Sequence, residues 1–180
     1  EPEQGLEERD RPHGFIILQS AYSGIASPLA RRLRADFGYD IILLALHEKG
    51  IPNSSHFNFR RDDFKDIVCW DPVLQPPDRS SVLPPAELAQ QAEEVEHRLG
   101  VNCLDLIRGD RHLGRDFVVG VRAMRSTIGR SVNFAQSLHM VLKLCEFSDD
   151  LLRQYQPEFI IGFPGTIYAD VLISMAEYRD

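Results

Sequence analysis

The sequence predicts an α/β fold, namely a Rossmann-like open sheet of mostly parallel strands with helices on both faces. Two apolar segments of strand length, 14–20 and 39–46, are separated by a segment with helical periodicity, which is the pattern of a strand–helix–strand unit. Both segments are too continuously apolar to have a solvent-exposed face. Strand-like and helix-like segments then alternate to the end of the chain, as in an α/β domain.

The helix between the first two strands is expected to begin at Ser27. This serine precedes Pro28, which is the order of an N-cap and a proline in the first helical position. Apolar residues recur at helical spacing over 29–37, and Gly38 suits the end of the helix. Residues 21–27 are therefore expected to form a loop that ends at this cap.

The later segments are expected to continue the alternation. Residues 66–70 predict a short third strand, and residues 86–99 predict a helix that ends at Gly100. The segment 101–107 fits either a short strand or a helical turn, and both alternatives stay open. Three further elements are predicted: a long helix over 131–155 that Pro157 ends, a strand over 158–163 and a final helix over 167–179.

The composition is typical of a globular domain. The chain has 180 residues, of which 43% are hydrophobic and 26% are charged, and this is enough to build one core. No apolar run reaches the roughly 18 residues of a membrane-spanning helix, so no transmembrane segment and a cytoplasmic location are expected. The net charge of -7 argues against a nucleic-acid partner. Residues 1–13 predict a disordered lead-in, and residues 14–180 a single Rossmann-like domain of a longer chain.

Cysteine and histidine patterns predict neither a metal site nor a resident cofactor. The three cysteines, Cys69, Cys103 and Cys145, form no CxxC pair and no zinc spacing, which favours buried thiols in a reducing compartment. The six histidines include no HExxH pair. The chain also has no GxSxG nucleophile motif, no GxGxxG dinucleotide motif and no phosphate-binding P-loop.

Ligands of open parallel sheets bind beyond the carboxyl ends of the strands, and three predicted loops qualify there, over 19–27, 47–56 and 162–170. The first holds Ser23 and Gly24, and the last holds Gly165 and Thr166, with Thr166 expected to cap the final helix. Free N–H groups at such helix N-termini bind a phosphate, a carboxylate or a sugar hydroxyl. These four residues are therefore candidate substrate-binding residues, and an ordinary capped turn is the alternative at each loop.

The segment LIRGDRHLGRDF, residues 106–117, concentrates charge directly after an apolar run. Asp110 and His112 are the candidate catalytic residues, because either side chain is suited to act as general base on a hydroxyl group. Arg111 and Arg115 are candidate substrate-binding residues, because guanidinium groups bind phosphates and carboxylates bidentately. The alternative is a solvated loop with local ion pairs of little energetic weight.

The order of elements, with DRHLGR at 110–115 and PEFIIGFPGT at 157–166, resembles the N-terminal half of a two-domain GT-B glycosyltransferase of surface or capsular polysaccharide synthesis. The resemblance extends from Gly14 to the last helix. It implies transfer of a sugar from a nucleotide sugar to a saccharide acceptor, with the acceptor held by this domain. A C-terminal domain, missing here, would hold the nucleotide. The chain alone is then expected to be inactive. A location peripheral to the membrane is compatible with this function for the full-length protein.

Two alternatives from other functional classes stay open. A free-standing flavodoxin-like or hydrolase domain that binds a phosphorylated small molecule predicts that this chain binds nucleotides or phosphates by itself. A non-catalytic Rossmann-like interaction module predicts self-association, with a homodimer as its simplest form, and no response to small ligands.

Overall fold

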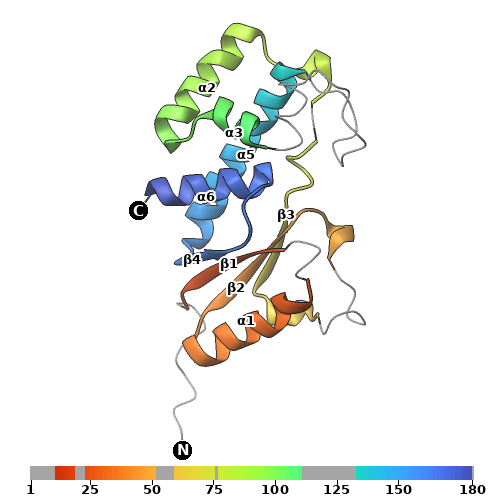
Figure 1. The fold of residues 1–180 in the computed structure, drawn as a ribbon, viewed down its shortest axis with the longest axis vertical. Helices are drawn as coiled ribbons and strands as arrows, with labels where there is room; N and C mark the ends of the chain where they lie inside the picture. Colours follow the sequence, from red (N-terminus) through yellow and green to blue (C-terminus); the bar gives the residue numbers. More distant parts are fainter. Residues whose placement is uncertain (1–10, 19–22, 52–58, 76, 111–132, 180) are drawn as a thin grey trace, which may run out of the picture. The chain divides into compact units, whose positions relative to one another are not determined.

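The structure is a computed structural model that describes residues 11–18, 23–51, 59–75, 77–110 and 133–179. Within these residues the fold is α/β, with four parallel strands in an open sheet and five α-helices (Figure 1). The predicted Rossmann-like fold class is therefore confirmed. No helix among the described residues is long and apolar enough to cross a membrane.

The chain divides into two compact units. Unit 1 consists of Glu1–Cys69 and Tyr155–Gly162, and unit 2 consists of Trp70–Gln154 and Phe163–Asp180. Unit 1 contains the sheet and one α-helix, whereas the other α-helices lie in unit 2 apart from one terminal residue. The expectation of one domain over residues 14–180 stays a prediction.

The sheet has the strand order β3-β2-β1-β4, with every neighbouring pair parallel. Its central strands are almost entirely buried, which confirms that neither has a solvent-exposed face. The register places the first residue of β1 opposite the first residue of β2, so polar residues at these positions meet at the amino end of the sheet. The strands are β1 (His13–Leu18), β2 (Asp40–Ala45), β3 (Asp66–Cys69) and β4 (Phe159–Ile161).

Helix α1 (Ser23–Phe37) lies beside the sheet (Figure 1), and its Ala26 and Ala30 belong to one buried cluster with apolar side chains of β1 and β2. It begins at Ser23, so the prediction of Ser27 as N-cap is wrong, and Pro28 lies inside the helix. A proline near the start of a helix loses one hydrogen bond, here to the carbonyl of Gly24, and tertiary packing compensates for that loss. The helix ends where predicted, at Gly38 with its positive φ of 77°.

Ser27 contributes to the packing of α1 instead of capping it. Its side chain is fully buried, and its hydroxyl oxygen accepts a hydrogen bond from the Arg60 N–H at 2.8 Å. The same hydroxyl lies 3.3 Å from the Arg60 carbonyl oxygen, to which it donates. Both backbone groups of Arg60 are thereby satisfied against the helix, next to the 3-10 turn η3 (Arg61–Asp63).

Unit 2 is helical, and its elements lie close to their predicted positions. The segment whose type stayed open, 101–107, is helical from Cys103 onward, because Asn102 Oδ1 accepts a hydrogen bond from the Asp105 N–H at 2.9 Å and caps the start of a helix. The helices are α2 (Pro85–Leu99), α3 (Cys103–Gly109), α5 (Phe134–Tyr155) and α6 (Ile167–Arg179).

The cysteines are free thiols, of which Cys103 and Cys145 are fully buried and Cys69 is half-buried. The neighbouring Cys103 side chain and burial in the core both raise the pKa of the Cys145 thiol. A raised pKa keeps this thiol protonated and unreactive. This agrees with the prediction of structural cysteines for Cys103 and Cys145.

Candidate functional site

The structure brings together three of the predicted site residues. Asp110, Gly165 and Thr166 meet in unit 2, at the N-terminus of α6. Ser23 and Gly24 form the first turn of α1, in unit 1. The remaining candidates, Arg111, His112 and Arg115, lie outside the described residues.

Asp110 is the C-terminal cap residue of α3, a helix that packs against α6. Its side chain is 2% exposed, and its Oδ2 accepts a hydrogen bond from the backbone N–H of Ile167 at 2.9 Å. Ile167 is the first residue of α6, where the helix dipole favours a negative charge. Asp110, which the sequence predicts as a general base, therefore caps the N-terminus of α6 through this long-range hydrogen bond.

The loop before α6 is held by a second carboxylate. The N–H of Gly165 donates to Asp170 Oδ1 at 2.8 Å, and the φ of Gly165 is 110°, a value that requires glycine. The N–H groups of Gly165 and Ile167 are thus engaged, so these two are not free to bind a ligand. Thr166 occupies the predicted N-cap position, since its carbonyl oxygen accepts the Asp170 N–H at 2.9 Å, but its buried Oγ1 makes no hydrogen bond among the described residues and so does not cap the helix.

A tryptophan that the sequence analysis did not select lies at the same helix turn. Trp70 is fully buried, and its ring lies 4.7 Å from the ring of Tyr168, the second residue of α6. Its Nε1 has no hydrogen-bond acceptor within the described ranges. The available signal was that Trp70 is the only tryptophan of the chain and follows β3 directly.

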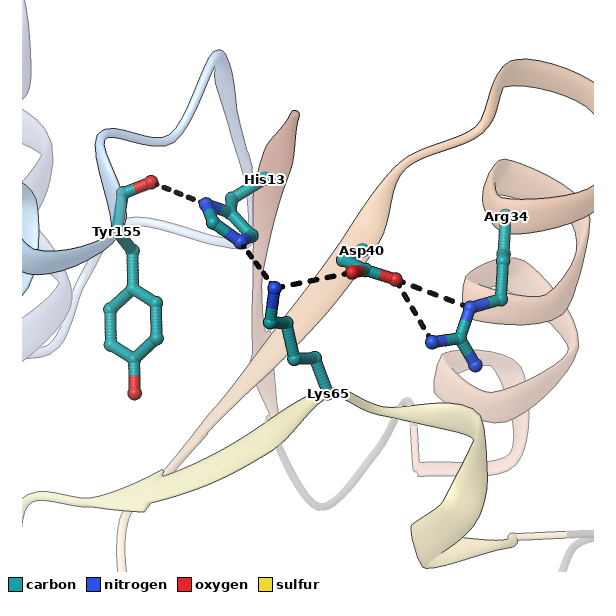
Figure 2. A network of polar contacts seen from close by, with 5 residues as sticks. All are labelled: His13, Arg34, Asp40, Lys65 and Tyr155. Carbon is teal, nitrogen blue, oxygen red and sulfur yellow. Dashed lines mark hydrogen bonds and ion pairs between the residues drawn. The ribbon is translucent and has the colours of Figure 1, made fainter. Parts of the chain in front are cut away.

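A second polar cluster lies at the amino end of the sheet, in unit 1 (Figure 2). Asp40 Oδ1 accepts hydrogen bonds from Arg34 Nη2 at 2.9 Å and from Arg34 Nε at 3.3 Å. Asp40 Oδ2 lies 3.3 Å from Lys65 Nζ, which in turn lies 3.0 Å from His13 Nε2. His13 Nδ1 is 2.7 Å from the carbonyl oxygen of Tyr155, the last residue of α5. Because that carbonyl only accepts, Nδ1 carries the proton and Nε2 accepts from Lys65.

Opposite charges control the electrostatics of this second cluster. Burial raises the pKa of the Asp40 carboxyl, but hydrogen bonds and attraction from Arg34 and Lys65 outweigh burial and leave that pKa below 3.8. The Tyr155 hydroxyl donates to Asp66, so both ends of this residue are anchored. Burial and Asp66 raise the pKa of the Tyr155 hydroxyl. Within the cluster every buried side-chain N or O atom has a partner among the described residues, which is the pattern of a structural network.

The position of this cluster also argues for a structural role. Ligands of open parallel sheets bind at the carboxyl ends of the strands, whereas His13 and Asp40 are the first residues of β1 and β2. His13 falls within the predicted lead-in, and Asp40 is not among the predicted site residues. A lone acid at the start of an otherwise apolar strand was the available signal.

The α6 N-terminus is therefore the candidate site, because it alone of the two clusters leaves buried polar atoms unsatisfied among the described residues. Its groups suit hydrogen bonding to a small ligand. Over the described ranges, no group of three or more His, Cys, Asp or Glu side chains is arranged to hold a metal ion. Comparison with known proteins adds no relative: no protein-family model matches the chain, and no curated protein or solved structure shows significant similarity to it.

Proposed function

We propose that the chain is the acceptor-side domain of a nucleotide-sugar-dependent glycosyltransferase, with the saccharide acceptor bound at the N-terminus of α6. One observation supports this most: Asp110 is joined to the Gly165–Thr166 loop across 57 residues by its hydrogen bond to Ile167. Two segments selected for their chemistry thus form one cluster. Hydroxyl, indole and carboxylate groups are the kinds of polar group that bind sugar hydroxyls.

The transfer reaction needs a base that takes a proton from the acceptor hydroxyl, and Asp110 and His112 are the candidates. Asp110 already uses Oδ2 to hold Ile167, and its side chain is buried. This favours a positioning role for Asp110, with His112, two residues further along the chain, as the base. Arg111 and Arg115 lie on either side of His112 in the sequence, and their guanidinium groups are then expected to bind the charged nucleotide-sugar donor.

The alternative of a phosphate-binding domain has less support at this loop. Phosphate binding at a helix N-terminus uses free backbone N–H groups. The N–H groups of Gly165 and Ile167 donate to Asp170 and Asp110 instead. An anion would have to displace a side chain of the same sign at each position.

Sugar transfer by the natural full-length protein tests the proposal. A panel of nucleotide sugars and oligosaccharide acceptors is assayed with the wild type, Asp110→Ala, His112→Ala and the matched control Asp150→Asn, an exposed acid in α5. We expect transfer to fall at least about a hundredfold in His112→Ala and to be unchanged in Asp150→Asn. Full transfer by the Asp110, His112 double variant, or no transfer with any substrate pair, contradicts the proposal.

Ligand-dependent melting of the chain gives a second measurement. A ligand at about a hundred times its Kd adds roughly 2.7 kcal/mol to the free energy of unfolding. An acceptor-side domain is stabilised by saccharides and not by nucleotides or phosphate. The reverse result supports a self-contained domain for a phosphorylated ligand.

A further inference from the structure

We propose that His13 and Lys65 form a proton-sensitive switch at the amino end of the sheet. While the imidazole is neutral, the Lys65 ammonium group joins His13 to Asp40. When the imidazole gains a proton, His13 takes the place of Lys65 at Asp40, and the lysine side chain turns to solvent. All three residues belong to unit 1, so the switch is independent of the acceptor role proposed for unit 2.

The contacts of His13 require a neutral imidazole. His13 Nε2 lies 3.0 Å from Lys65 Nζ, and His13 Nδ1 lies 2.7 Å from the carbonyl oxygen of Tyr155 (Figure 2). An ammonium group only donates and a carbonyl oxygen only accepts, so the ring must accept at Nε2 and donate from Nδ1. The imidazolium ion donates from both nitrogens and so does not fit this pair of partners.

Protonation of His13 would place two cations against each other. The new N–H at Nε2 would face an ammonium nitrogen 3.0 Å away, which has no lone pair to accept it. Lys65 is the partner able to leave, because its side chain is 38% exposed and has a flexible four-carbon stem. His13 stays in place, since it belongs to β1 and its Nδ1 donates to the Tyr155 carbonyl at a helix C-terminus, where a positive charge is favoured.

Asp40 offers the imidazolium a partner once Lys65 has left. Asp40 lies opposite His13 in the parallel register of β1 and β2, and its Oδ2 is 3.3 Å from the same Lys65 Nζ that contacts His13. Its other oxygen, Oδ1, accepts from Arg34 and takes no part in the exchange. His13 and Lys65 thus compete for one carboxylate oxygen, and Asp40 keeps a cation at Oδ2 in both states.

Two further acids lie around His13 among the described residues, and each already has a partner. The N–H of Glu158 donates to the His13 carbonyl oxygen at 2.9 Å, and its carboxylate accepts from the Tyr39 hydroxyl at 2.6 Å. The Asp66 carboxylate accepts from the Tyr155 hydroxyl. Asp40 is therefore the acid that shares a partner with His13.

Asp40 stays ionised while an imidazole titrates. Burial raises the pKa of its carboxyl, but hydrogen bonds from Arg34 and Lys65 outweigh burial and lower that pKa. Lysine and arginine keep their charge in neutral and mildly acidic solution. An imidazole is the only one of these side-chain types that ordinarily changes charge between about pH 5 and pH 8. One proton at His13 therefore sets the state of the switch.

The switch controls a side-chain link across the sheet. Lys65 directly precedes the edge strand β3, whereas His13 begins β1, and β2 lies between these two strands. With a neutral imidazole, the Lys65 side chain joins the start of the edge strand to a central strand. Protonation removes this link and leaves the backbone hydrogen bond from the Lys65 N–H to the Ile41 carbonyl oxygen at 2.8 Å.

Side-chain NMR of the 180-residue chain tests the exchange. The chain has three lysines and six histidines, so the variants Lys65→Arg and His13→Gln assign the two sets of signals. From about pH 8 to about pH 5, where imidazoles titrate, we expect the Lys65 ε-methylene resonances to move with the same midpoint as the His13 ring resonances. Nuclear Overhauser contacts between the two side chains should be present above that midpoint and lost below it.

His13→Gln should abolish the pH response of the Lys65 resonances, because it removes the titrating group. His97→Gln is the matched control, since His97 is an exposed histidine of α2 in unit 2, and it should leave the response unchanged. If His13→Gln does not fold, which the dispersion of its amide spectrum reports, His13→Asn gives the same comparison. The titration of the wild type needs neither variant.

Each of the following results overturns the switch. The Lys65 resonances stay in place while His13 titrates, or the Lys65 response survives in the His13 variant. The Overhauser contact persists below the midpoint. The ring nitrogen shifts place the proton of neutral His13 on Nε2, or His13 does not titrate in this range.

Discussion

The amino end of the sheet and the N-terminus of α6 each contain a buried carboxylate, but only one of the two regions satisfies its polar groups. Asp40 is 5% exposed and is held by two cations, whereas Asp110 is 2% exposed and accepts a backbone N–H. Around Asp40, every buried side-chain N or O atom of the cluster in Figure 2 has a partner among the described residues. Around Asp110 the buried atoms Trp70 Nε1 and Thr166 Oγ1 lack partners among the described residues. A matched network stabilises a fold, and an incomplete one indicates where a ligand belongs.

The largest effect is expected for Asp40→Asn, which should lower the free energy of unfolding by about 2 kcal/mol. The change leaves Arg34 and Lys65 to share a neutral acceptor. The loss is smaller than for a fully buried pair, because these side chains are 41% and 38% exposed and solvent screens them. Urea unfolding measures the change, with Asp36→Asn as control. Asp36 pairs with Arg32 at the helix surface, so a loss there as large as at Asp40 contradicts the network.

The stabilisation that the Asp40 carboxylate gives to the folded protein should be lost as the pH is lowered. The Asp40 pKa lies below 3.8 in the folded protein and near 3.8 in the unfolded chain. The stabilisation is therefore fully present above about pH 4 and is lost as the pH falls through the folded pKa. The difference in unfolding free energy between wild type and Asp40→Asn should stay constant at about 2 kcal/mol over pH 5–7. It should become smaller below pH 4. A difference that does not shrink excludes the carboxylate charge as its cause.

Asp110→Ala should cost about 1.5 kcal/mol, because the buried Ile167 N–H loses its acceptor at a helix N-terminus. Asp110→Asn should cost less, since the amide oxygen still accepts. Denaturant unfolding and amide exchange at Ile167 measure both variants. Equal losses in the two variants would show that the charge of Asp110 matters more than its hydrogen bond.

Ser27→Ala should cost about 1 kcal/mol, because the Arg60 N–H loses the buried serine hydroxyl that accepts its hydrogen bond, whereas the Arg60 carbonyl keeps the Asp63 N–H as donor. Hydrogen exchange at the Arg60 amide should accelerate together with the loss in stability. Unchanged exchange at Arg60 would mean that water replaces the serine hydroxyl.

Thr166→Val should have the smallest effect, within about 0.5 kcal/mol and of stabilising sign, since no hydrogen bond among the described residues is lost. Thermal unfolding in the absence of ligand measures it. The comparison with Ser27→Ala is direct, because each variant removes one hydroxyl group. A loss at Thr166 as large as that at Ser27 would show that Thr166 Oγ1 is satisfied in solution.

Local sequence patterns were sufficient for most elements of the fold. The apolar runs of β1 and β2 and the helical spacing of α5 reflect burial, which acts on every residue of an element and so leaves a repeated signal. The start of α1 was misplaced because Pro28 was taken as a boundary, while packing against the sheet tolerates it inside the helix. The helix at 101–107 stayed open because seven residues carry too little periodicity to decide.

The sequence by itself determined the α/β class, the parallel sheet and the charged segment around Asp110, since these depend on composition and periodicity along the chain, whereas among the described residues three α-helices in succession replace the expected alternation between β3 and β4. Only the tertiary structure decided which polar groups meet. The hydrogen bond between Asp110 and Ile167, the packing of Trp70 on Tyr168 and the sharing of Asp40 by Arg34 and Lys65 join separate elements. Such pairs leave no periodic signal, because each is a single contact whose partners are chosen by how the elements pack.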